Sequence, residues 1–424
     1  MAPSDEESLC VAKQGLMNSH KSLLPSNTLI VGNMEEHWNS QHEDEPLRVM
    51  FVHTSLTMGG EEVLLVEIIR RMNRARCTPE LCCLKERGPL GADLADEGIP
   101  VFDQLMTHKY DIRVWQRLTH LFRERKIDAV VTVGTGGDKM FWGRLAAWRA
   151  NVPVIVSSIH STGWPIRVEW VNRRLAPMTD AFIAVAEKHG EHIIEHEGCP
   201  REKVCVIPNG VDIDIFQPQE RNVTLRAELG LPADAPVAGL VAVIREEKNH
   251  GRFLRVARAV HEQLPTTHFL LVGAGPELPD YEQMARDLGI GEAVHFVGRR
   301  TDIPALLSEL DLFLLTSDME ASPVSILEAM ACGLPVVSTR VGSISETIAD
   351  GVSGYLVEKT AEDEMAARVT ELLTDPQKSR EMGNAGRQRV VAGYSVERMV
   401  EGYEDLLTEL HECKRPVVNS PAVV

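Results

Sequence analysis

Residues 317–339 read SDMEASPVSILEAMACGLPVVST, a stretch that passes from a polar loop into a helix and then into a buried strand. The apolar run DLFLLT precedes it, and a helix that starts near Val324 separates that run from LPVVST. Two short apolar strands joined through a helix form a parallel pair, because parallel strands need a long crossover connection. This stretch therefore predicts a parallel β-sheet covered by helices.

The same alternation of strands and helices extends along most of the chain. A first series of strands begins at Leu47, and a second series follows the segment PNGVDIDIFQP, whose prolines and glycine interrupt the pattern. The runs are LRVMFVHT, ELCCL, IDAVVTV, VPVIVSSI, DAFIAV and KVCVIP in the first series, and VAGLVAVI, HFLLVG, AVHFVG, DLFLLT and LPVVST in the second. We expect an α/β protein with two parallel sheets, each with helices on both faces.

The chain length fits two domains, because 424 residues exceed what one ordinary core supports. A final helix, SVERMVEGYEDLLTELHE, carries an apolar stripe and is expected to pack back on the first domain. The expected segments are a disordered or loosely attached acidic tail at 1–45, a first domain at 46–207, a linker at 208–218, a second domain at 219–394, the returning helix at 395–413 and a flexible tail at 414–424.

Composition and charge exclude several classes of function. Hydrophobic residues make up 44% and charged residues 25% of the chain, and no apolar run approaches the ~20 residues of a membrane span. The opening MAPSDEESLC lacks the features of a secretory signal, so we expect a cytoplasmic protein. A net charge of −18 argues against binding nucleic acid, which requires a basic surface. The eight scattered cysteines predict neither a disulfide framework nor a zinc site.

Positive charge and tryptophan are concentrated in the first half of the chain. Arginines cluster at 70–76 and 113–125, and tryptophans follow them in the sequence. These residues form either solvated helix faces, which is the commoner case, or a surface for contact with the inner face of a membrane that carries a lipid acceptor. The tryptophans are Trp142, Trp148, Trp164 and Trp170.

Two glutamates in the opening stretch, Glu320 and Glu328, are separated by seven residues. The first follows a strand and the second lies near the start of the next helix, so both are expected at the carboxyl end of the sheet, where ligands bind in open α/β folds. Amides at the helix start, including those of Ser322 and Val324, favour phosphate or sugar oxygens. Carboxylates accept hydrogen bonds from hydroxyl groups, so the combination suits a sugar nucleotide.

This stretch resembles the E-x7-E motif of the family-4 retaining glycosyltransferases, whose GT-B fold has two facing Rossmann-like domains with the donor cleft between them. The resemblance extends from about Leu47 to Leu410 and includes the segments DAFIAVAE, VIPNGVD and EAMACGLPVV. It implies transfer of a sugar from a nucleotide diphosphate sugar, with retained anomeric configuration, in glycan biosynthesis. It also implies that Glu320 contacts the donor sugar and that Glu328 contacts the ribose hydroxyls.

Two cations follow a strand in the segment VAVIREEKNH. The resemblance supports Lys248 as a catalytic, donor-binding lysine, because fixed cations stabilise the charge that accumulates on a departing diphosphate. Many relatives carry an arginine at the position of Val243, whereas this chain has Arg245. We expect Arg245 to contact the phosphate, with exposure to solvent as the alternative.

The first domain is expected to supply the other side of the site. Gly59 and Gly60 open the first helix, where glycines let the backbone approach a phosphate, and the resemblance makes this the loop that faces the diphosphate. His160 ends a strand, and similar enzymes place a histidine here near the sugar and the acceptor. In isolation, a Gly-Gly pair is more often a tight turn and a histidine is more often structural.

Two glycine-rich segments resemble nucleotide-binding loops. Gly273 and Gly275 precede Pro276 and lack the third glycine of a dinucleotide fingerprint, so we expect a turn in the donor cleft rather than a nicotinamide site. The segment 134–139 lacks the spacing of a P-loop and predicts another turn between a strand and a helix.

Two sets of residues resemble metal ligands. Asp212 and Asp214 have the spacing of the carboxylates in the metal-dependent glycosyltransferase fold, but they lie in the expected linker. His189, His192 and His196 share one face of an expected helix without a carboxylate or cysteine framework, which favours a solvated polar face. We expect no metal and no cofactor.

The predicted reaction is a metal-independent front-face displacement in which the departing diphosphate oxygen helps to deprotonate the acceptor. A sugar-nucleotide epimerase on the same fold is one alternative, and a non-catalytic sugar-nucleotide-binding protein is another. The sequence identifies neither the base nor the sugar of the donor, and lipid, glycan, protein and small-molecule acceptors remain open.

Overall fold

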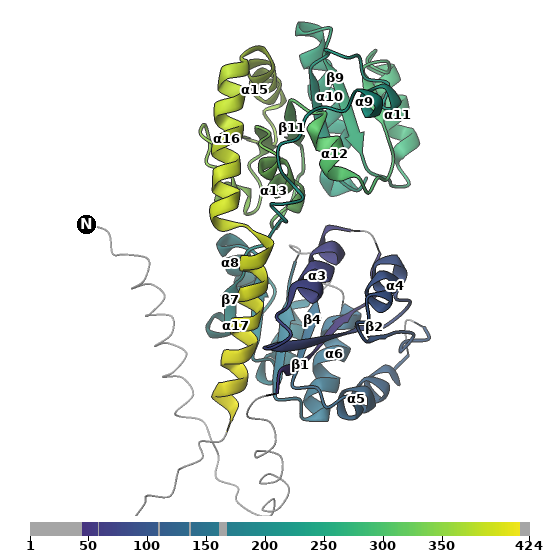
Figure 1. Cartoon of the computed structure of the whole chain (residues 1–424), viewed down its shortest axis with the longest axis vertical. Coiled ribbons are helices and arrows are strands. Elements are labelled where there is room, and N and C mark those ends of the chain that lie inside the picture. Colours follow the sequence, from purple (N-terminus) through teal and green to yellow (C-terminus); the bar gives the residue numbers. More distant parts are fainter. Residues whose placement is uncertain (1–44, 58, 109–110, 135–136, 161–167, 416–424) are drawn as a thin grey trace, which may run out of the picture.

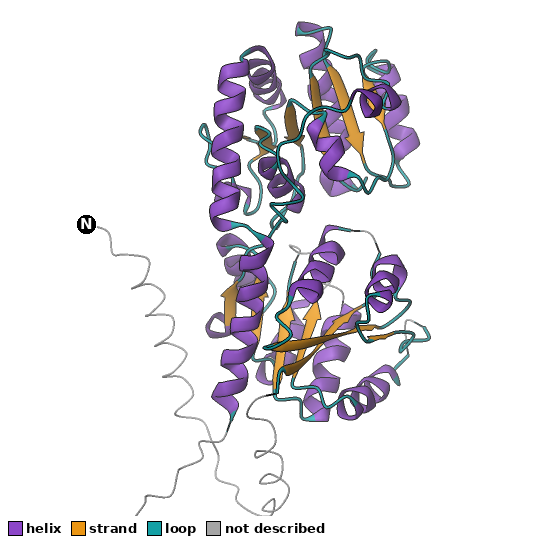
Figure 2. Cartoon of the chain, viewed as in Figure 1, coloured by secondary structure: helices purple, strands orange, loops and turns teal. Residues whose placement is uncertain are grey.

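The computed structural model describes residues 45–57, 59–108, 111–134, 137–160 and 168–415. It contains two lobes, one above the other in Figure 1, and each lobe contains one parallel sheet with helices around it (Figure 2). This arrangement confirms the predicted α/β architecture of two Rossmann-like domains. Nearly all of the expected tail at 1–45, and residues 416–424, lie outside the described residues.

The first sheet has seven parallel strands in the order β3-β2-β1-β4-β5-β6-β7. Every residue of β4 and β5 is buried, as expected for strands that helices cover on both faces. The direction of the strand order reverses between β1 and β4, which defines a topological switch point. The strands are β1 (Leu47–His53), β2 (Cys77–Cys83), β3 (Val101–Phe102), β4 (Ala129–Val133), β5 (Val154–Ser158), β6 (Ala181–Ala184) and β7 (Val204–Val206).

Helices cover both faces of this sheet because successive strand residues point to opposite sides. Cys83 packs in a core with α3 and α17 (Val396–Lys414), whereas Cys82 packs in a separate core with α5 and α6. The helices of the first domain are α3 (Gly60–Arg71), α4 (Gly88–Asp96), α5 (Val114–Glu124), α6 (Gly137–Ala150), α7 (Val168–Leu175), η1 (Ala176–Met178), α8 (Glu187–His196) and η2 (Arg201–Lys203).

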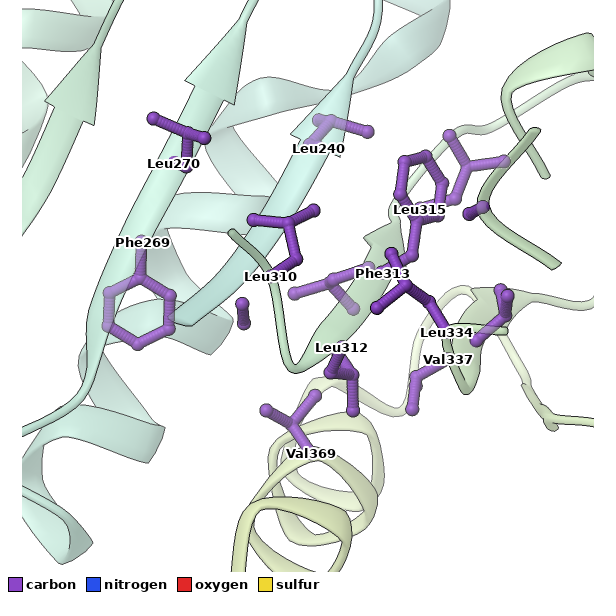
Figure 3. Packing of buried hydrophobic residues seen from close by; sticks show 14 of the residues in the cluster. Leu240, Phe269, Leu270, Leu310, Leu312, Phe313, Leu315, Leu334, Val337 and Val369 are labelled. Atoms are coloured by element: carbon purple, nitrogen blue, oxygen red, sulfur yellow. The ribbon is translucent and has the colours of Figure 1, made fainter. Parts of the chain in front are cut away.

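The second sheet has six parallel strands in the order β10-β9-β8-β11-β12-β13, with its switch point between β8 and β11. Its buried side chains form one continuous core, part of which Figure 3 shows around Phe313. The strands are β8 (Val237–Val241), β9 (His268–Val272), β10 (Val294–Phe296), β11 (Leu312–Leu315), β12 (Val336–Thr339) and β13 (Tyr355–Val357). The helices are α9 (Val223–Glu228), η3 (Glu246–Lys248), α10 (His250–Gln263), α11 (Leu278–Asp287), α12 (Ile303–Ser308), α13 (Val324–Ala331), α14 (Ile344–Thr347), α15 (Glu362–Thr374) and α16 (Pro376–Gly393).

The chain crosses between the domains twice, and the two crossings lie side by side. The Val211 amide donates to the Tyr394 carbonyl oxygen at 2.9 Å, and the Val396 amide donates to the Val211 carbonyl oxygen at 3.0 Å. After the second crossing, α17 (Val396–Lys414) runs along the first domain (Figure 1). Its Tyr403 and Leu407 are buried in the same core as α3. Helix α17 is therefore part of the first domain's core.

The surface of the first domain carries two of the tryptophans singled out in the sequence. Trp148 on α6 is 53% exposed and Trp170 on α7 is 61% exposed. Trp142 is partly buried and Trp164 lies outside the described residues. None of the described helices has both the length and the apolar character needed to cross a membrane.

Candidate active site

Lys248 and Glu320 meet at the switch point of the second sheet. They lie in the loops after β8 and β11, which are neighbouring parallel strands and therefore end at the same edge. Nζ of Lys248 lies 2.6 Å from Oε1 of Glu320, and the Ser317 hydroxyl donates to the same oxygen at 2.7 Å. Glu320 is only 7% exposed. The ammonium group is thus held at the position where open α/β sheets bind ligands.

Asn249 fixes the turn that carries Lys248. It adopts a left-handed conformation with φ of 46°, and its Oδ1 accepts a hydrogen bond from the Arg252 amide, which caps α10. Its Nδ2 donates to Oδ2 of Asp318 at 2.7 Å, and the Thr316 hydroxyl donates to its carbonyl oxygen at 3.1 Å. These bonds tie the loop after β8 to the loop after β11. The asparagine between Lys248 and the helix is a helix-cap signal that the sequence analysis missed.

The loop after β12 supports Glu320 from its other side. Gly342 has φ of +52°, and a β-carbon there would lie 1.6 Å from the carbonyl oxygen of Glu320. Any side chain at this position would therefore push the backbone of Glu320 away. The Thr339 hydroxyl also donates to the Ser317 carbonyl oxygen at 2.6 Å. Gly342 was not predicted as part of the site, although it lies three residues after the end of the predicted strand LPVVST.

Glu328 lies in the second turn of α13, eight residues after Glu320. The residue is partly exposed, but protein surrounds its carboxyl group closely enough that desolvation raises the pKa of Glu328 to about 7. Within the described ranges, the carboxyl group forms no hydrogen bond or ion pair with another residue. It is therefore available to accept hydrogen bonds from hydroxyl groups of a ligand.

The start of α13 in the second domain faces the start of α3 in the first. A β-carbon at Gly60 would lie 3.9 Å from Cγ2 of Val324, and Val324 packs against the core of the first domain. Nearby, Nδ2 of Asn209 donates to the carbonyl oxygen of Ser322 at 2.9 Å. The first-turn amides of a helix lack partners within the helix. Two sets of such amides therefore lie near each other where the two domains meet.

The start of α3 carries more negative charge than the Gly-Gly pair alone suggested. Oε1 of Glu61 lies 3.0 Å from Nε2 of His53. Glu62 folds back over Gly59, so that a β-carbon at Gly59 would lie 2.4 Å from its Oε2. These two carboxylates reduce the electropositive character of the helix start. The backbone of Gly59 and Gly60 can donate to a phosphate, but the local charge does not attract one.

His160 lies just past the carboxyl end of β5 in the first sheet and is partly exposed. Its Nε2 lies 2.9 Å from Oγ of Ser158, and that oxygen lies 2.6 Å from Oη of Tyr403 on α17. No hydrogen bond or ion pair connects it with Lys248 or Glu320 among the residues that the structure describes. The structure thus places His160 on the first-domain side, separate from the charged pair.

Arg245 is more exposed than Lys248, the other cation expected to bind the donor. Its side chain is 61% exposed, and Nη1 lies 3.8 Å from Oε1 of Glu247. An ion pair of this length at the surface contributes little to stability. The exposed side chain can turn toward a phosphate, but no hydrogen bond to another described residue holds it there.

Gly273 and Gly275 let the loop after β9 pack against the loop after β8. Their β-carbons would lie 1.9 Å from the Ala242 carbonyl oxygen and 2.2 Å from the Ile244 carbonyl oxygen, respectively. The Ile244 amide donates to the Ala274 carbonyl oxygen at 3.1 Å. These glycines therefore position the loop that leads to Lys248. In the other glycine-rich segment, 134–139, residues 135 and 136 lie outside the described residues.

Asp212 performs a structural role in the crossing between the domains. Its Oδ1 accepts hydrogen bonds from the amides of Asp214 and Ile215, both at 3.0 Å, and its Oδ2 pairs with Arg71 of the first domain. Both carboxylate oxygens are thus used within the protein. No group of three or more His, Cys, Asp or Glu residues in the described ranges is arranged to hold a metal ion.

The expected solvated face of three histidines on α8 is wrong for one of them. His189 is fully buried, and its Nδ1 accepts a hydrogen bond from the Val185 amide at 3.2 Å. The rings of His192 and His196 stack with centroids 4.7 Å apart on the outer side of the helix. His189 is buried because the first turn of α8 packs directly against the end of β6, which the helical spacing alone did not reveal.

Two family models match the chain, one in each domain. The model described as Glycosyltransferase Family 4 matches residues 58–215, and the model described as Glycosyl transferases group 1 matches residues 222–389. The matches meet at the first crossing between the domains, and together they include all the expected site residues.

Individual relatives support the same assignment. The chain is 27% identical over 379 residues to the UDP-Gal:alpha-D-GlcNAc-diphosphoundecaprenol alpha-1,3-galactosyltransferase of Escherichia coli, across 86% of this chain and 97% of the relative. It is 31% identical over 288 residues to the GDP-mannose-dependent alpha-(1-6)-phosphatidylinositol monomannoside mannosyltransferase of Mycolicibacterium smegmatis, across 65% and 74%. Its fold resembles that of Anabaena HepE in complex with UDP and glucose, with a TM-score of 0.75, 23% identity and coverage of 86% and 100%. The chain belongs to the family-4 glycosyltransferases and has the GT-B fold.

Proposed function

We propose that this glycosyltransferase moves a hexose from a nucleoside diphosphate donor to its acceptor with retention of the anomeric configuration. The observation that carries the proposal is the pairing of Lys248 with Glu320 at the switch point of the second sheet. Glu328 lies on α13, whose start lies next to Gly60 of the first domain. These groups match the parts of a sugar nucleotide: a diphosphate, a ribose and a hexose.

The diphosphate is the natural partner of Lys248. An ammonium group has three N–H donors, and Glu320 accepts one of them, so two remain for phosphate oxygens. A cation that the protein already holds in place stabilises the leaving diphosphate without reorganisation during the reaction. Arg245 is proposed to add a second, mobile cation, and the amides of Gly59, Gly60, Ser322 and Val324 donate further hydrogen bonds.

The two carboxylates are proposed to bind the hydroxyl groups of the donor. Glu320 is nearly buried and uses one oxygen for Lys248 and Ser317, which leaves the other for a hexose hydroxyl. Glu328 accepts the ribose hydroxyls. Gly273 and Gly275 keep the loop after β9 close enough to complete this side of the cleft.

The proposed mechanism is a front-face displacement that requires neither a metal nor a cofactor. The bond between the anomeric carbon and the diphosphate oxygen breaks, and the acceptor oxygen forms its bond on the same face. The acceptor proton passes to the departing diphosphate oxygen, so no carboxylate needs to attack the sugar. The fixed ammonium group and the helix amides support this proposal, because they can stabilise the diphosphate charge that a metal would otherwise neutralise.

The proposed acceptor is a lipid-linked or glycan substrate that approaches from the first domain. The names of two relatives specify lipid-linked acceptors. Exposed Trp148 and Trp170 lie on the first domain, and the Arg174 guanidinium lies 5.1 Å from the ring centre of Trp170. Aromatic and cationic side chains of this kind favour an anionic membrane surface. Cosedimentation with anionic vesicles should fall for W148S/W170S, while neutral vesicles should bind neither protein.

The central test combines donor binding with product analysis. Thermal shifts with uridine, guanosine and adenosine diphosphates and their hexose conjugates should identify a stabilising donor. Transfer to lipid-linked and free sugars, followed by NMR, should show the donor's anomeric configuration in the product, with equal rates in EDTA. An inverted product or a requirement for added metal contradicts the mechanism. Conversion of donor alone to an epimer favours the epimerase, and binding without transfer or hydrolysis favours a binding protein.

A further inference from the structure

A chain of hydrogen bonds connects the C-terminal helix with His160. Oη of Tyr403 lies 2.6 Å from Oγ of Ser158, and this oxygen lies 2.9 Å from Nε2 of His160. Tyr403 and Ser158 are buried, whereas His160 is partly exposed. The chain therefore leads from the protein interior to a partly exposed residue at the carboxyl end of β5.

The hydroxyl protons of Tyr403 and Ser158 indicate which atom donates in each of the two hydrogen bonds. Burial raises the pKa of Tyr403, so its phenol stays protonated and must donate a hydrogen bond. Among the described residues, Ser158 Oγ is the hydrogen-bond partner of this phenol, so Tyr403 donates to Ser158. The hydroxyl proton of Ser158 is then available for the bond to Nε2 of His160, and we assign it to that bond. A neutral imidazole that accepts at Nε2 carries its own proton on Nδ1.

We propose that Tyr403 and Ser158 are positioning residues that hold His160 in the Nδ1–H tautomer, so that it acts as a hydrogen-bond donor and not as a general base. This inference rests on the proposed function, in which His160 lies near the sugar and the acceptor. With Nε2 engaged by Ser158, the other ring nitrogen already carries a proton and cannot take one from the acceptor. The acceptor proton then goes to the departing diphosphate oxygen, as a front-face displacement requires.

The arrangement also gives the returning helix a role beyond packing. Tyr403 comes from α17, which follows the entire second domain in the sequence. The last helix thus sets the orientation of a histidine that lies more than 240 positions earlier, since Ser158 and Tyr403 are 245 residues apart.

The direct test is the ring-nitrogen NMR spectrum of the full-length protein labelled with 15N-histidine. Loss of signals in H160N assigns His160. The wild-type protein should show the proton on Nδ1. Y403F keeps the aromatic ring in the core but removes the donor to Ser158, so the proportion of the Nε2–H tautomer should rise. A wild-type proton on Nε2, or an unchanged spectrum in Y403F, overturns the proposal.

Two controls separate this effect from simple destabilisation. Y355F removes a phenol of the second domain, whose Oη lies 3.2 Å from Glu371, and should leave the His160 signals unchanged. L407V loosens the packing of α17 and should lower the melting temperature without changing the tautomer. A tautomer change in L407V equal to that in Y403F overturns the specific role of the phenol.

Activity measurements separate this inference from the proposed function. Y403F and S158A should lower kcat roughly three- to tenfold, as expected for one lost hydrogen bond, with little change in the KM of the donor. If H160N transfers sugar at the wild-type rate while the NMR result holds, the hydrogen-bond chain stands and the role of His160 in transfer is rejected. If H160N is impaired but the spectrum of Y403F is unchanged, His160 has a role in transfer and the proposed effect of the hydrogen-bond chain is rejected.

Discussion

The two domains share one strand order but hold their candidate site residues in different ways. In the second domain, Lys248 and Glu320 are fixed by hydrogen bonds within that domain, between loops that follow adjacent strands. In the first domain, the site consists of backbone at Gly59 and Gly60 and of one histidine, whose orientation depends on a helix from the far end of the chain. The second domain thus positions its site residues by itself, whereas the first domain depends on α17 from a distant part of the sequence.

The two halves also differ in charge. The second domain presents a held ammonium group and a carboxyl group with a raised pKa, whereas two carboxylates surround the start of α3 in the first. Recognition of a diphosphate should therefore reside mainly in the second domain. The first domain is then free to vary its loops toward different acceptors without loss of the donor site.

The largest effect is expected for K248A. Loss of the ammonium group that pairs with Glu320 should reduce kcat about 100- to 1000-fold, as for other groups that stabilise developing charge. Steady-state transfer assays measure this, with a thermal melt to show that the protein remains folded. K359A, which removes an exposed lysine of the same domain, should behave as the wild type.

If kcat of folded K248A fell by less than about threefold, the proposed difference between the two domains would be wrong. The diphosphate charge would then be stabilised from the first domain, despite its carboxylates. The same measurement on E320Q sharpens the result, because glutamine keeps the shape of the side chain but releases the ammonium group from its charged partner.

The second effect concerns the pH dependence of donor binding. The pKa of Glu328 is raised to about 7 by desolvation, and ribose hydroxyls bind its ionised form best. Donor affinity should therefore rise as the pH increases through 7, with binding about tenfold weaker at pH 6 than at pH 8. Calorimetry in buffers of different ionisation enthalpy should also detect proton release on binding. In E328Q, donor binding should be weaker and independent of pH in this range.

The raised pKa of Glu328 also affects the stability of the protein when no donor is bound. A carboxyl group with a raised pKa in the folded state binds its proton more tightly there than in the unfolded chain. Its contribution to stability is complete below the ordinary glutamate pKa of 4.5 and is lost as the pH rises through about 7. E328Q should therefore gain stability relative to the wild type as the pH rises from 5 to 8. Equal pH profiles for both proteins would show that Glu328 is well solvated.

The sequence predicted the fold well where strands were long and apolar. It missed β3 and β13, because they contain only two and three residues, and it placed the start of β2 three residues late, because Thr78 and Pro79 interrupt the apolar pattern of that strand. Short edge strands are defined by their neighbours in the sheet more than by their own composition. The order of the strands also requires spatial information that periodicity does not contain.

The candidate site also contains some residues that the sequence could predict and others that it could not. The proximity of Lys248 and Glu320 could be expected, because both follow parallel strands and such loops converge at one edge. Asn249 and Gly342 had local signals, a cap residue and a glycine after a strand, that pointed to structure without naming their partners. The contact of Tyr403 with Ser158 had no signal, since it joins residues 245 positions apart through a buried face.

A third and smaller effect is expected where the halves touch directly. The two carboxylate oxygens of Glu346 on α14 accept hydrogen bonds from the Glu187 and Lys188 amides at 2.8 and 2.7 Å, at the start of α8. The N-cap residue Ala186 provides no side-chain cap, so Glu346 caps this helix from the other domain. E346A should lower stability by about 0.5–2 kcal/mol.

Loss of this cap should also loosen the two domains relative to each other. Small-angle scattering of donor-free E346A should show a larger radius of gyration, and the donor KM should rise two- to threefold with kcat nearly unchanged. E381A on α16 removes an exposed glutamate whose carboxylate accepts a hydrogen bond from Gln377 of the same helix, and it serves as the control. An unchanged radius together with a lower melting temperature would restrict Glu346 to a stabilising role.

The smallest effects are expected from a pair of charge changes of opposite sign. R245A removes the exposed cation of the second domain, and E62Q removes a carboxylate beside Gly59 in the first. If the charge difference between the halves directs the diphosphate, R245A should weaken donor binding about threefold and E62Q should strengthen it by a similar factor. Both effects should shrink at high salt, because exposed charges are screened within about 10 Å at 0.1 M.

The salt dependence of donor binding distinguishes a direct contact between Arg245 and the phosphate from a long-range attraction. R380A changes the net charge by the same amount as R245A but lies on α16, so it should leave donor affinity unaltered at any salt concentration. Weaker binding in R245A that persists in high salt would indicate a direct bond between its guanidinium group and a phosphate. No change in R245A would leave this arginine in solvent, and the diphosphate would then depend on Lys248 and the helix amides.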